Sequence, residues 1–452
     1  MGVVCSSATT STYHALILYR LNRNMFLAAA PYFQTRFQSD PWIYANSQSA
    51  IISTSTIVNL GAMLILTRIQ SSANYPLRIN IALLINVAVF ALLTLSTTSA
   101  FLDAPPKLYL AFLLLMVALT ALAAGLMQNG AFSFVASFGR PEYTQAIMVG
   151  QGVAGILPPL TQMFSYLAFA DPSPGIPPPD QPSSEVSSSP PPQNTEGATA
   201  AFIYFLTAVL ISALTFAAFI PLVRRHSLLT RRRTLPPSPG ADDLSQSTTT
   251  LNSAASSSSE TTPTALPTPT RRHIPLTTLL LKLRWLAAAV SMCFVVAMFF
   301  PVFTAKILSV HDSAGGGGGL FSPGAFIPLG FFFWNLGDLA GRVSAVLPPF
   351  AWLRARPRVL FGFGVLRWAF LPLYLLCNLH GRGAVVESDL FYLGVVQFPF
   401  GLTNGWLGSS AMMAAGEWVG EDEREAAGGF MGMCLVGGLA LGSVLSFTAA
   451  GV

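Results

Sequence analysis

Charged residues are scarce in this 452-residue chain, at 10% of the total, whereas 52% of its residues are hydrophobic and its mean hydropathy is +0.57. Soluble proteins carry about 25% charged residues, so this composition excludes an ordinary soluble protein and predicts a membrane protein. The formal net charge is +5, but the basic residues lie in short segments between apolar runs. That distribution does not indicate a partner such as nucleic acid.

Cysteine is also scarce: there are four, none in a CxxC pair, so we predict no disulfide, no metal site and no cofactor. The chain has no Walker A sequence and no HExxH, which leaves ATP-driven transport and zinc-dependent proteolysis unsupported. A membrane aspartyl protease would need two aspartates inside apolar runs, and only Asp338 is so placed. The chain is therefore not expected to be an enzyme.

Long apolar runs make up most of the sequence, and ten of them are clear. Each is about as long as the ~20 residues that a helix needs to cross a bilayer. They lie near residues 48–67, 79–100, 108–135, 144–169, 200–222, 284–305, 323–349, 358–378, 388–413 and 426–450. A less clear run near 13–37 is interpreted as a first helix, which gives an all-α polytopic protein with eleven transmembrane helices.

The first of these runs is atypical. Arg20, Asn22 and Arg23 lie inside residues 13–37. An arginine at the centre of a membrane helix costs about 2.5–3.5 kcal/mol on the insertion scale. We therefore expect this segment, as written, to insert poorly.

Two segments are polar and biased in composition. Residues 171–198 are rich in proline and serine, and residues 223–282 are rich in serine, threonine and proline, with arginine clusters at both ends. Both are expected to be disordered. The second divides the chain into an amino-terminal bundle of six helices (1–222) and a carboxy-terminal bundle of five (283–452). That division is typical of the major-facilitator architecture, which has two bundles around a central cavity.

The distribution of lysine and arginine predicts the orientation of the chain. If the amino terminus is cytosolic, sixteen basic residues fall in cytosolic loops and four on the opposite side. The positive-inside rule therefore predicts a cytosolic amino terminus, a cytosolic 223–282 loop and an outside carboxyl terminus. We expect the plasma membrane rather than a vacuolar or lysosomal membrane.

Asp338 and Arg342 are the most informative residues. They lie four apart in the apolar run FIPLGFFFWNLGDLAGRVSAVL (326–347), so both lie on one face of a helix, one turn apart. Asn335 lies on the same side. An ion pair offsets part of the cost of burying charge in a membrane, so this stripe should contact protein or a water-filled cavity. A transport pathway and a structural ion pair between helices both remain open.

Other polar residues in apolar runs have alternative interpretations. Gln128 and Asn129 could bind a heterocyclic base or sugar hydroxyls, or could form hydrogen bonds between helices. Asn404 indicates either a local kink or packing. The glycines of 150–155 and 428–446 are interpreted as packing surfaces. Arg367 is interpreted as a side chain that extends to the cytosolic surface.

Several of these segments, in this order, resemble the equilibrative nucleoside transporter family. The resemblance extends over nearly the whole chain and rests on NMFLAAAPYFQTRF (24–37), QNGAFSFVASF with PEYTQAIMVGQGVAG (128–155), FWNLGDLAGR (333–342), RWAFLPLYLLCN (367–378), GLTNGWLGSSAMM (401–413) and the glycine-rich 428–446. Arg23 departs from the pattern, because the family usually has tryptophan before the asparagine of helix one.

The resemblance implies a major-facilitator-like fold and passive transport of nucleosides through the lipid bilayer. It also implies that the substrate is bound by Asn24, Gln128, Asn335, Asp338 and Arg342. Two alternatives remain: a carrier of the same architecture for another small polar solute, and a membrane sensor or scaffold that does not transport. Because Arg342 should favour the charged form of Asp338, proton coupling is not expected.

Overall fold

The structure is a computed structural model that describes residues 33, 36–69, 74–98, 105–169, most of 202–220, 274–311, 319–446 and 448. These residues are almost entirely helical, and none of them forms a β-strand. The helices are α3 (Pro41–Arg68), α4 (Tyr75–Ser96), α6 (Pro106–Ala136), α7 (Pro141–Phe169), α9 (Leu276–Ala297), α10 (Phe300–Thr304), α11 (Pro323–Ser344), α12 (Pro348–Arg354), α13 (Pro357–Leu366), α14 (Phe370–Tyr374), α15 (Phe398–Glu417) and α16 (Arg424–Ser446), with 3₁₀ turns η2 (Gly319–Phe321), η3 (Arg367–Ala369) and η5 (Glu421–Glu423) and a π-helix, η4 (Phe391–Gln397).

Local sequence explains where several helices begin. The Asp40 carboxylate accepts hydrogen bonds from the backbone N–H groups of Trp42 and Ile43, which caps α3. The Asn74 side chain accepts from the Leu77 N–H and caps α4 in the same way. Most of the other helices have proline in their first turn, where its missing N–H costs nothing. Capping residues and prolines therefore fix these boundaries.

Each of the ten clear apolar runs coincides with helical structure, which confirms them as helices. Residues 200–222 contain the helical segment Phe205–Ala217. Most of the first run, 13–37, lies outside the described residues, so the total of eleven helices stays a prediction. Two runs are less regular than predicted: 358–378 divides into α13, η3 and α14, and 388–413 begins with the π-helix η4.

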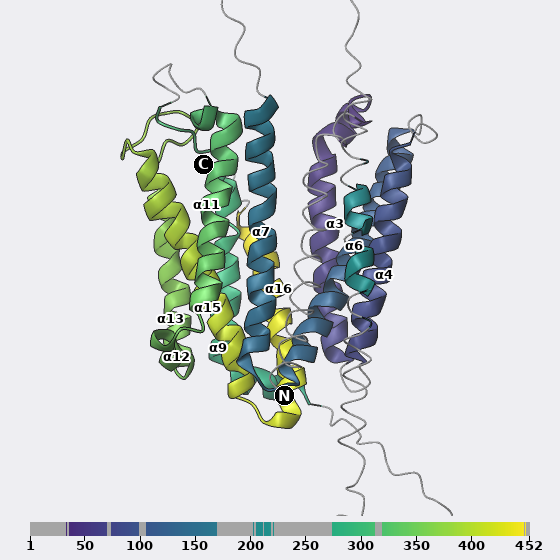
Figure 1. Cartoon of the computed structure of the whole chain (residues 1–452), viewed down its shortest axis with the longest axis vertical. Coiled ribbons are helices and arrows are strands. Elements are labelled where there is room, and N and C mark those ends of the chain that lie inside the picture. Colours follow the sequence, from purple (N-terminus) through teal and green to yellow (C-terminus); the bar gives the residue numbers. More distant parts are fainter. Residues whose placement is uncertain are drawn as a thin grey trace, which may run out of the picture.

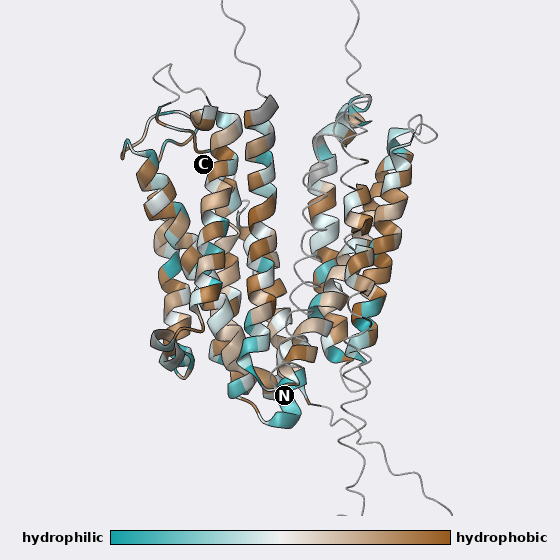
Figure 2. Ribbon diagram, viewed as in Figure 1, coloured by the Kyte–Doolittle hydropathy of each residue, from teal (hydrophilic) through white to brown (hydrophobic). Residues whose placement is uncertain are grey.

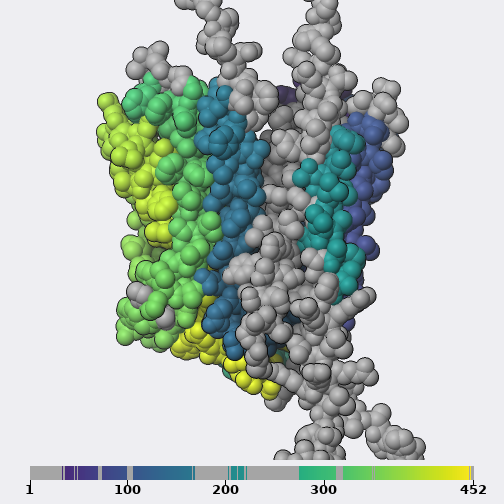
Figure 3. Space-filling view, viewed as in Figure 1, coloured from purple at the N-terminus to yellow at the C-terminus, as the bar shows by residue number. Residues whose placement is uncertain are grey.

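The helices form two groups in Figure 1. One contains α3, α4 and α6, and the other contains α9, α11, α13 and α15. Helices α7 and α16 lie between them: α7 packs mainly against α11, and α16 packs against α9, α6 and α3. Figure 3 shows α7 and α11 side by side on one face of the molecule.

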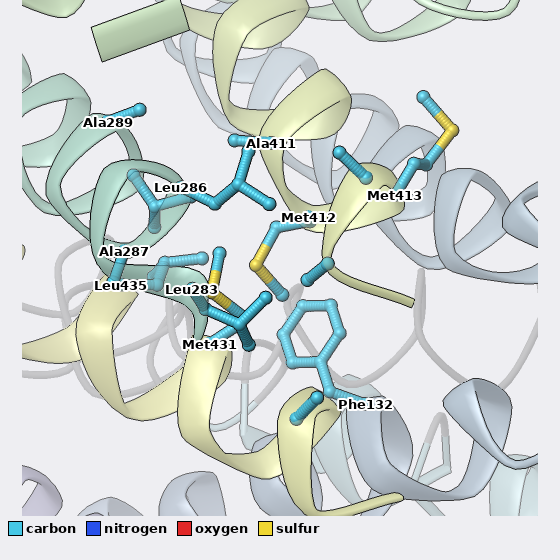
Figure 4. Close-up of a cluster of buried hydrophobic side chains, with 14 of the residues drawn as sticks. Phe132, Leu283, Leu286, Ala287, Ala289, Ala411, Met412, Met413, Met431 and Leu435 are labelled. Carbon is cyan, nitrogen blue, oxygen red and sulfur yellow. The ribbon is translucent and has the colours of Figure 1, made fainter. Parts of the chain in front are cut away.

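The largest buried cluster lies where α6, α9, α15 and α16 meet (Figure 4). Phe132 of α6 lies there with Leu283 of α9, Met412 of α15 and Met431 of α16, all almost completely buried. Methionine is flexible and fills irregular gaps between helices. This cluster therefore connects the two helix groups through one continuous apolar core.

The outside of the helix array is also apolar. Hydrophobic residues continue along the outer helices in Figure 2, and Ile57, Leu84 and Leu281 are each more than 60% exposed. Among the described residues, five helical segments are long and apolar enough to cross a membrane: Ser49–Arg68, Tyr75–Ser96, Pro106–Ala136, Leu276–Thr304 and Glu421–Ser446. An apolar exterior on such helices is what a lipid environment requires. The chain is an integral membrane protein.

Candidate functional site

The pair predicted from the sequence forms on α11. Arg342 Nε donates to Asp338 Oδ2 over 2.6 Å. Both residues are only 4% exposed, so the ion pair is buried inside the helix array. The spacing of four residues in one helix is sufficient to bring the two groups together. An ion pair buried this deeply needs further hydrogen bonds to offset its desolvation.

Helix α7 supplies some of those hydrogen bonds. Arg342 Nη1 donates to the backbone carbonyl of Met148 over 2.8 Å and to Gln151 Oε1 over 3.5 Å. Gln145 Nε2 in turn donates to the Arg342 carbonyl over 3.3 Å. Gly152 lies at the contact between the two helices, because a Cβ at that position would lie 3.0 Å from Arg342 Cδ and 3.2 Å from Leu339 Cα. The 150–155 glycines were interpreted as a packing surface, and Gly152 confirms it.

Helix α15 supplies the other partner. Asn404 Nδ2 donates to Asp338 Oδ1 over 2.8 Å, so both carboxylate oxygens of Asp338 accept hydrogen bonds. Asn404 is 1% exposed. A Cβ on either Gly401 or Gly405 would fall on a backbone carbonyl of α11, so α11 and α15 touch through their backbones. Of the two interpretations of Asn404, packing is therefore right, and the packing includes a specific hydrogen bond to Asp338.

The interpretation of Arg367 as a residue that extends to the cytosolic surface is wrong. Arg367 is 2% exposed, and its Nη1 donates to the carbonyl of Cys293 on α9 over 2.6 Å. Its Nε donates to Thr403 Oγ1 over 3.2 Å, and its guanidinium lies 4.8 Å from the centre of the Phe400 ring. The guanidinium is retained inside the bundle because backbone carbonyls and a ring face replace its water.

Cys293 connects Arg367 to the central pair. Its Sγ lies 3.3 Å from Asn404 Oδ1, within reach of a weak S–H hydrogen bond. Hydrogen bonds therefore run from Arg367 through Cys293 and Asn404 to Asp338. We call the set Asp338, Arg342, Asn404, Cys293 and Arg367 the polar core. It includes two cations and one anion from α9, α11, η3 and α15, and Arg342 connects it to Met148 and Gln151 of α7.

The remaining predicted site residues are not all in this network. Asn335 lies on α11 one turn before Asp338; its Nδ2 donates to the Phe331 carbonyl over 2.8 Å, and a Cβ on Gly155 would fall on its Oδ1. Gln128 lies on α6, in the other helix group, and is half-buried. Its Nε2 is buried and has no hydrogen-bond partner among the described residues. Asn24 lies outside the described residues.

Asn129 has a structural role, unlike its neighbour Gln128. Arg78 Nη1 donates to Asn129 Oδ1 over 2.5 Å and Arg78 Nη2 donates to the Ile69 carbonyl over 2.7 Å. Arg78 thereby holds the end of α3 against α6. Among the described residues, Gln128 Nε2 and Asn129 Nδ2 are both buried without a hydrogen-bond partner, so each amide keeps a donor for a ligand, while Arg78 engages the oxygen of Asn129.

The polar core offers the chemistry that a polyhydroxylated or heterocyclic solute requires. A carboxylate accepts from hydroxyl or N–H groups, and a guanidinium donates to hydroxyl, carbonyl or ring nitrogen acceptors. Sequence reasoning found Asp338 and Arg342 but missed Gln151, Cys293 and Arg367 as members of one network. One sequence feature could have identified Arg367 as part of this network: it is a charged residue inside an apolar run.

Comparison with known proteins gives consistent matches. A family model described as nucleoside transporter matches residues 114–179 and 183–450. The nucleoside transporter FUN26 of Saccharomyces cerevisiae is 30% identical over 435 residues, which cover 94% of this chain and 80% of that protein. Human equilibrative nucleoside transporter 1 is 33% identical over 163 residues, or 35% of each chain.

A solved structure also resembles this one in its fold. A variant of the fucose:proton symporter of E. coli matches with a TM-score of 0.53 at 15% identity, covering 98% of this chain and 92% of that one. At this identity the likeness concerns the fold alone. The helices therefore share the fold of this symporter, which agrees with the two-bundle, major-facilitator-like fold predicted from the sequence.

Proposed function

The chain belongs to the nucleoside transporter family, and we propose that it carries nucleosides across its membrane down their concentration gradient by alternating access. The observation that carries this proposal, beside the family, is the buried Asp338–Arg342 pair at a junction of three helices. A nucleoside presents ribose hydroxyls and a base edge with donors and acceptors. Those groups match a carboxylate beside a guanidinium.

The same proposal assigns roles to the other predicted residues. We infer that Asn335, Asp338 and Arg342 meet the substrate from the carboxy-terminal bundle (283–452), and Asn24 and Gln128 from the amino-terminal bundle (1–222). A site shared by both bundles suits a carrier in which one bundle rocks against the other around the substrate. On the asymmetry of basic residues we place the amino terminus and residues 223–282 in the cytosol. We further propose the plasma membrane as the location of the protein.

Transport by the purified protein tests this function. The full chain in proteoliposomes should take up labelled uridine saturably until the inside concentration equals the outside concentration. Unlabelled adenosine should compete and fucose should not, and a proton gradient should not raise the plateau. Competition by fucose but not adenosine would favour the alternative of another polar solute. No uptake by folded protein in which accessibility labelling shows residues 13–37 to span the membrane would favour a membrane sensor or scaffold.

Gln128 should affect substrate affinity rather than folding. A hydrogen bond from its unpaired amide to a ligand contributes about 0.5–1.5 kcal/mol net. Gln128→Ala should therefore raise the half-saturation concentration for uridine roughly 2–10-fold at near-normal surface expression. The matched control is Gln162→Ala, which removes an exposed amide from α7 and should leave the half-saturation concentration unchanged. An unchanged value for Gln128→Ala, or loss of folded protein, would assign Gln128 to packing.

A further inference from the structure

Three arginines at one end of the carboxy-terminal helices have no acidic partner in the described part of the chain. They are Arg284 on α9, Arg356 just before α13 and Arg358 in its first turn, and all three are exposed. Instead of carboxylates, they contact tryptophan rings. The guanidinium of Arg356 lies 4.6 Å from the centre of the Trp352 ring. We call these arginines and the two tryptophans Trp285 and Trp352 the basic–aromatic cluster.

Two of the arginines converge on one ring. Arg284 Cζ lies 5.7 Å and Arg358 Cζ 5.8 Å from the centre of the Trp285 ring, so the two cations are at most 11.5 Å apart. Phe361 of α13 packs against the same ring at 5.6 Å. Trp285 therefore packs between α9 and α13 with one cation from each helix near its ring, and an anion bound by both arginines would offset the repulsion between these like charges.

The acidic side chains nearby are already engaged by other cations. Lys282 Nζ lies 2.6 Å from Glu423 Oε1, Arg354 Nε lies 3.6 Å from Glu417 Oε1, and Arg424 Nη1 lies 3.3 Å from Glu421 Oε1. The described part of the chain thus supplies carboxylates to the neighbouring cations and none to the cluster. The tryptophan rings hold the arginines of the cluster in position but do not neutralise their positive charge.

If Thr304 lies at one edge of the hydrocarbon layer, helix length puts the cluster at the opposite edge, next to the headgroups. The span Leu276–Thr304 has 29 residues, whereas about 20 cross the hydrocarbon layer. Counting about 20 residues back from Thr304 reaches Arg284 and Trp285. Leu281, one turn before Trp285, is 70% exposed, and Val359 beside Arg358 is 39% exposed. Tryptophan and arginine with apolar neighbours at this depth are typical of a membrane interface.

We propose that the basic–aromatic cluster is a binding site for the headgroup of an anionic phospholipid. The phosphate and carboxylate of the headgroup would lie between Arg284 and Arg358, with Arg356 as a third cation, and the acyl chains would lie along the exposed apolar side chains of α9 and α13. Basic pockets between membrane helices bind anionic lipids in this way. The bound headgroup would hold the start of α13 against α9.

Thermal unfolding of the full chain in detergent tests the site. Short-chain phosphatidylserine should raise the unfolding temperature of the wild type, whereas short-chain phosphatidylcholine and inorganic phosphate should not. The double variant R284Q/R358Q should bind phosphatidylserine roughly tenfold or more weakly. The control is R68Q/R140Q, which removes two exposed arginines whose side chains contact no aromatic ring in the described part of the chain. It should respond like the wild type.

Several outcomes would overturn the proposal. If phosphatidylserine raises the unfolding temperature of the two double variants equally, the effect is a general attraction between basic residues and anionic lipid. A response to inorganic phosphate would show an anion site with no lipid specificity. If R284Q/R358Q does not fold, native mass spectrometry of the wild type decides, since phosphatidylserine should remain bound several-fold more often than phosphatidylcholine. Equal retention of the two lipids would contradict the site.

Discussion

Replacing Asp338 with alanine should sharply lower both the amount of folded protein and the uptake of nucleoside. Removing one partner of a buried ion pair costs about 3–5 kcal/mol, because the remaining charge stays buried without compensation. In Asp338→Ala that remaining charge is Arg342, and Asn404 Nδ2 loses its acceptor as well. Arg342→Ala should also be strongly destabilising.

The two single substitutions should destabilise the protein to different extents. Arg367 is a second cation in the polar core and interacts electrostatically with Asp338. After Arg342→Ala, Asp338 retains that cation and the Asn404 hydrogen bond. After Asp338→Ala, two buried cations remain and the polar core has lost its anion. We therefore expect Asp338→Ala to lower the unfolding temperature more than Arg342→Ala does.

The double variant Asp338→Ala/Arg342→Ala should recover some of the lost protein, because it leaves neither charge of the pair. Surface expression, unfolding temperature in detergent and uptake per folded molecule measure these effects separately. The control is Lys282→Ala, which breaks an ion pair whose lysine side chain is 45% exposed and should cost no more than about 1 kcal/mol. If the folded yield of the double variant equals the product of the two single losses, the two residues do not depend on each other.

The sequence predicted the part of the polar core that is local in one helix. Asp338 and Arg342 meet because four residues make about one helical turn, which no tertiary contact needs to specify. Asn404 lies 66 residues after Asp338, and Arg367 lies 74 residues after Cys293. Such contacts depend on how neighbouring helices are rotated and how closely they approach. Apolar composition sets neither, so the wider network was not predicted.

The same limit applies to the helices themselves. Their existence followed from runs of apolar residues, but their interruptions did not. Helix 358–378 is broken near Pro372, and the π-helix η4 ends just before Pro399. Proline removes an N–H donor and clashes with the carbonyl four residues earlier, so the backbone must rearrange locally. Proline is common in membrane helices, and its position alone does not specify whether a kink, a 3₁₀ turn or a π-helix results.

Replacing Gly405 with alanine should be one of the most damaging single-methyl changes in the chain. Its Cβ would fall on the Asp338 carbonyl oxygen and lie 2.9 Å from the Arg342 backbone nitrogen. Backbone atoms of α11 cannot rotate away as a flexible side chain would. The helices must separate, and overpacking of this kind costs about 1–3 kcal/mol or more.

The damage should extend to transport, because the displaced part of α11 holds Asp338 and Arg342. Gly416→Ala provides a control in the same helix, since a Cβ at Gly416 would have no atom within 4 Å. Alanine stabilises a helix interior by about 0.5–1 kcal/mol relative to glycine, so the control should unfold at the same or a higher temperature than the wild type. Within one helix, Gly405→Ala should thus lower the unfolding temperature, whereas Gly416→Ala should leave it unchanged or raise it. If Gly405→Ala unfolds at a temperature no lower than Gly416→Ala, α11 and α15 do not touch through their backbones at Asp338, and Asn404 is not held against its carboxylate as described.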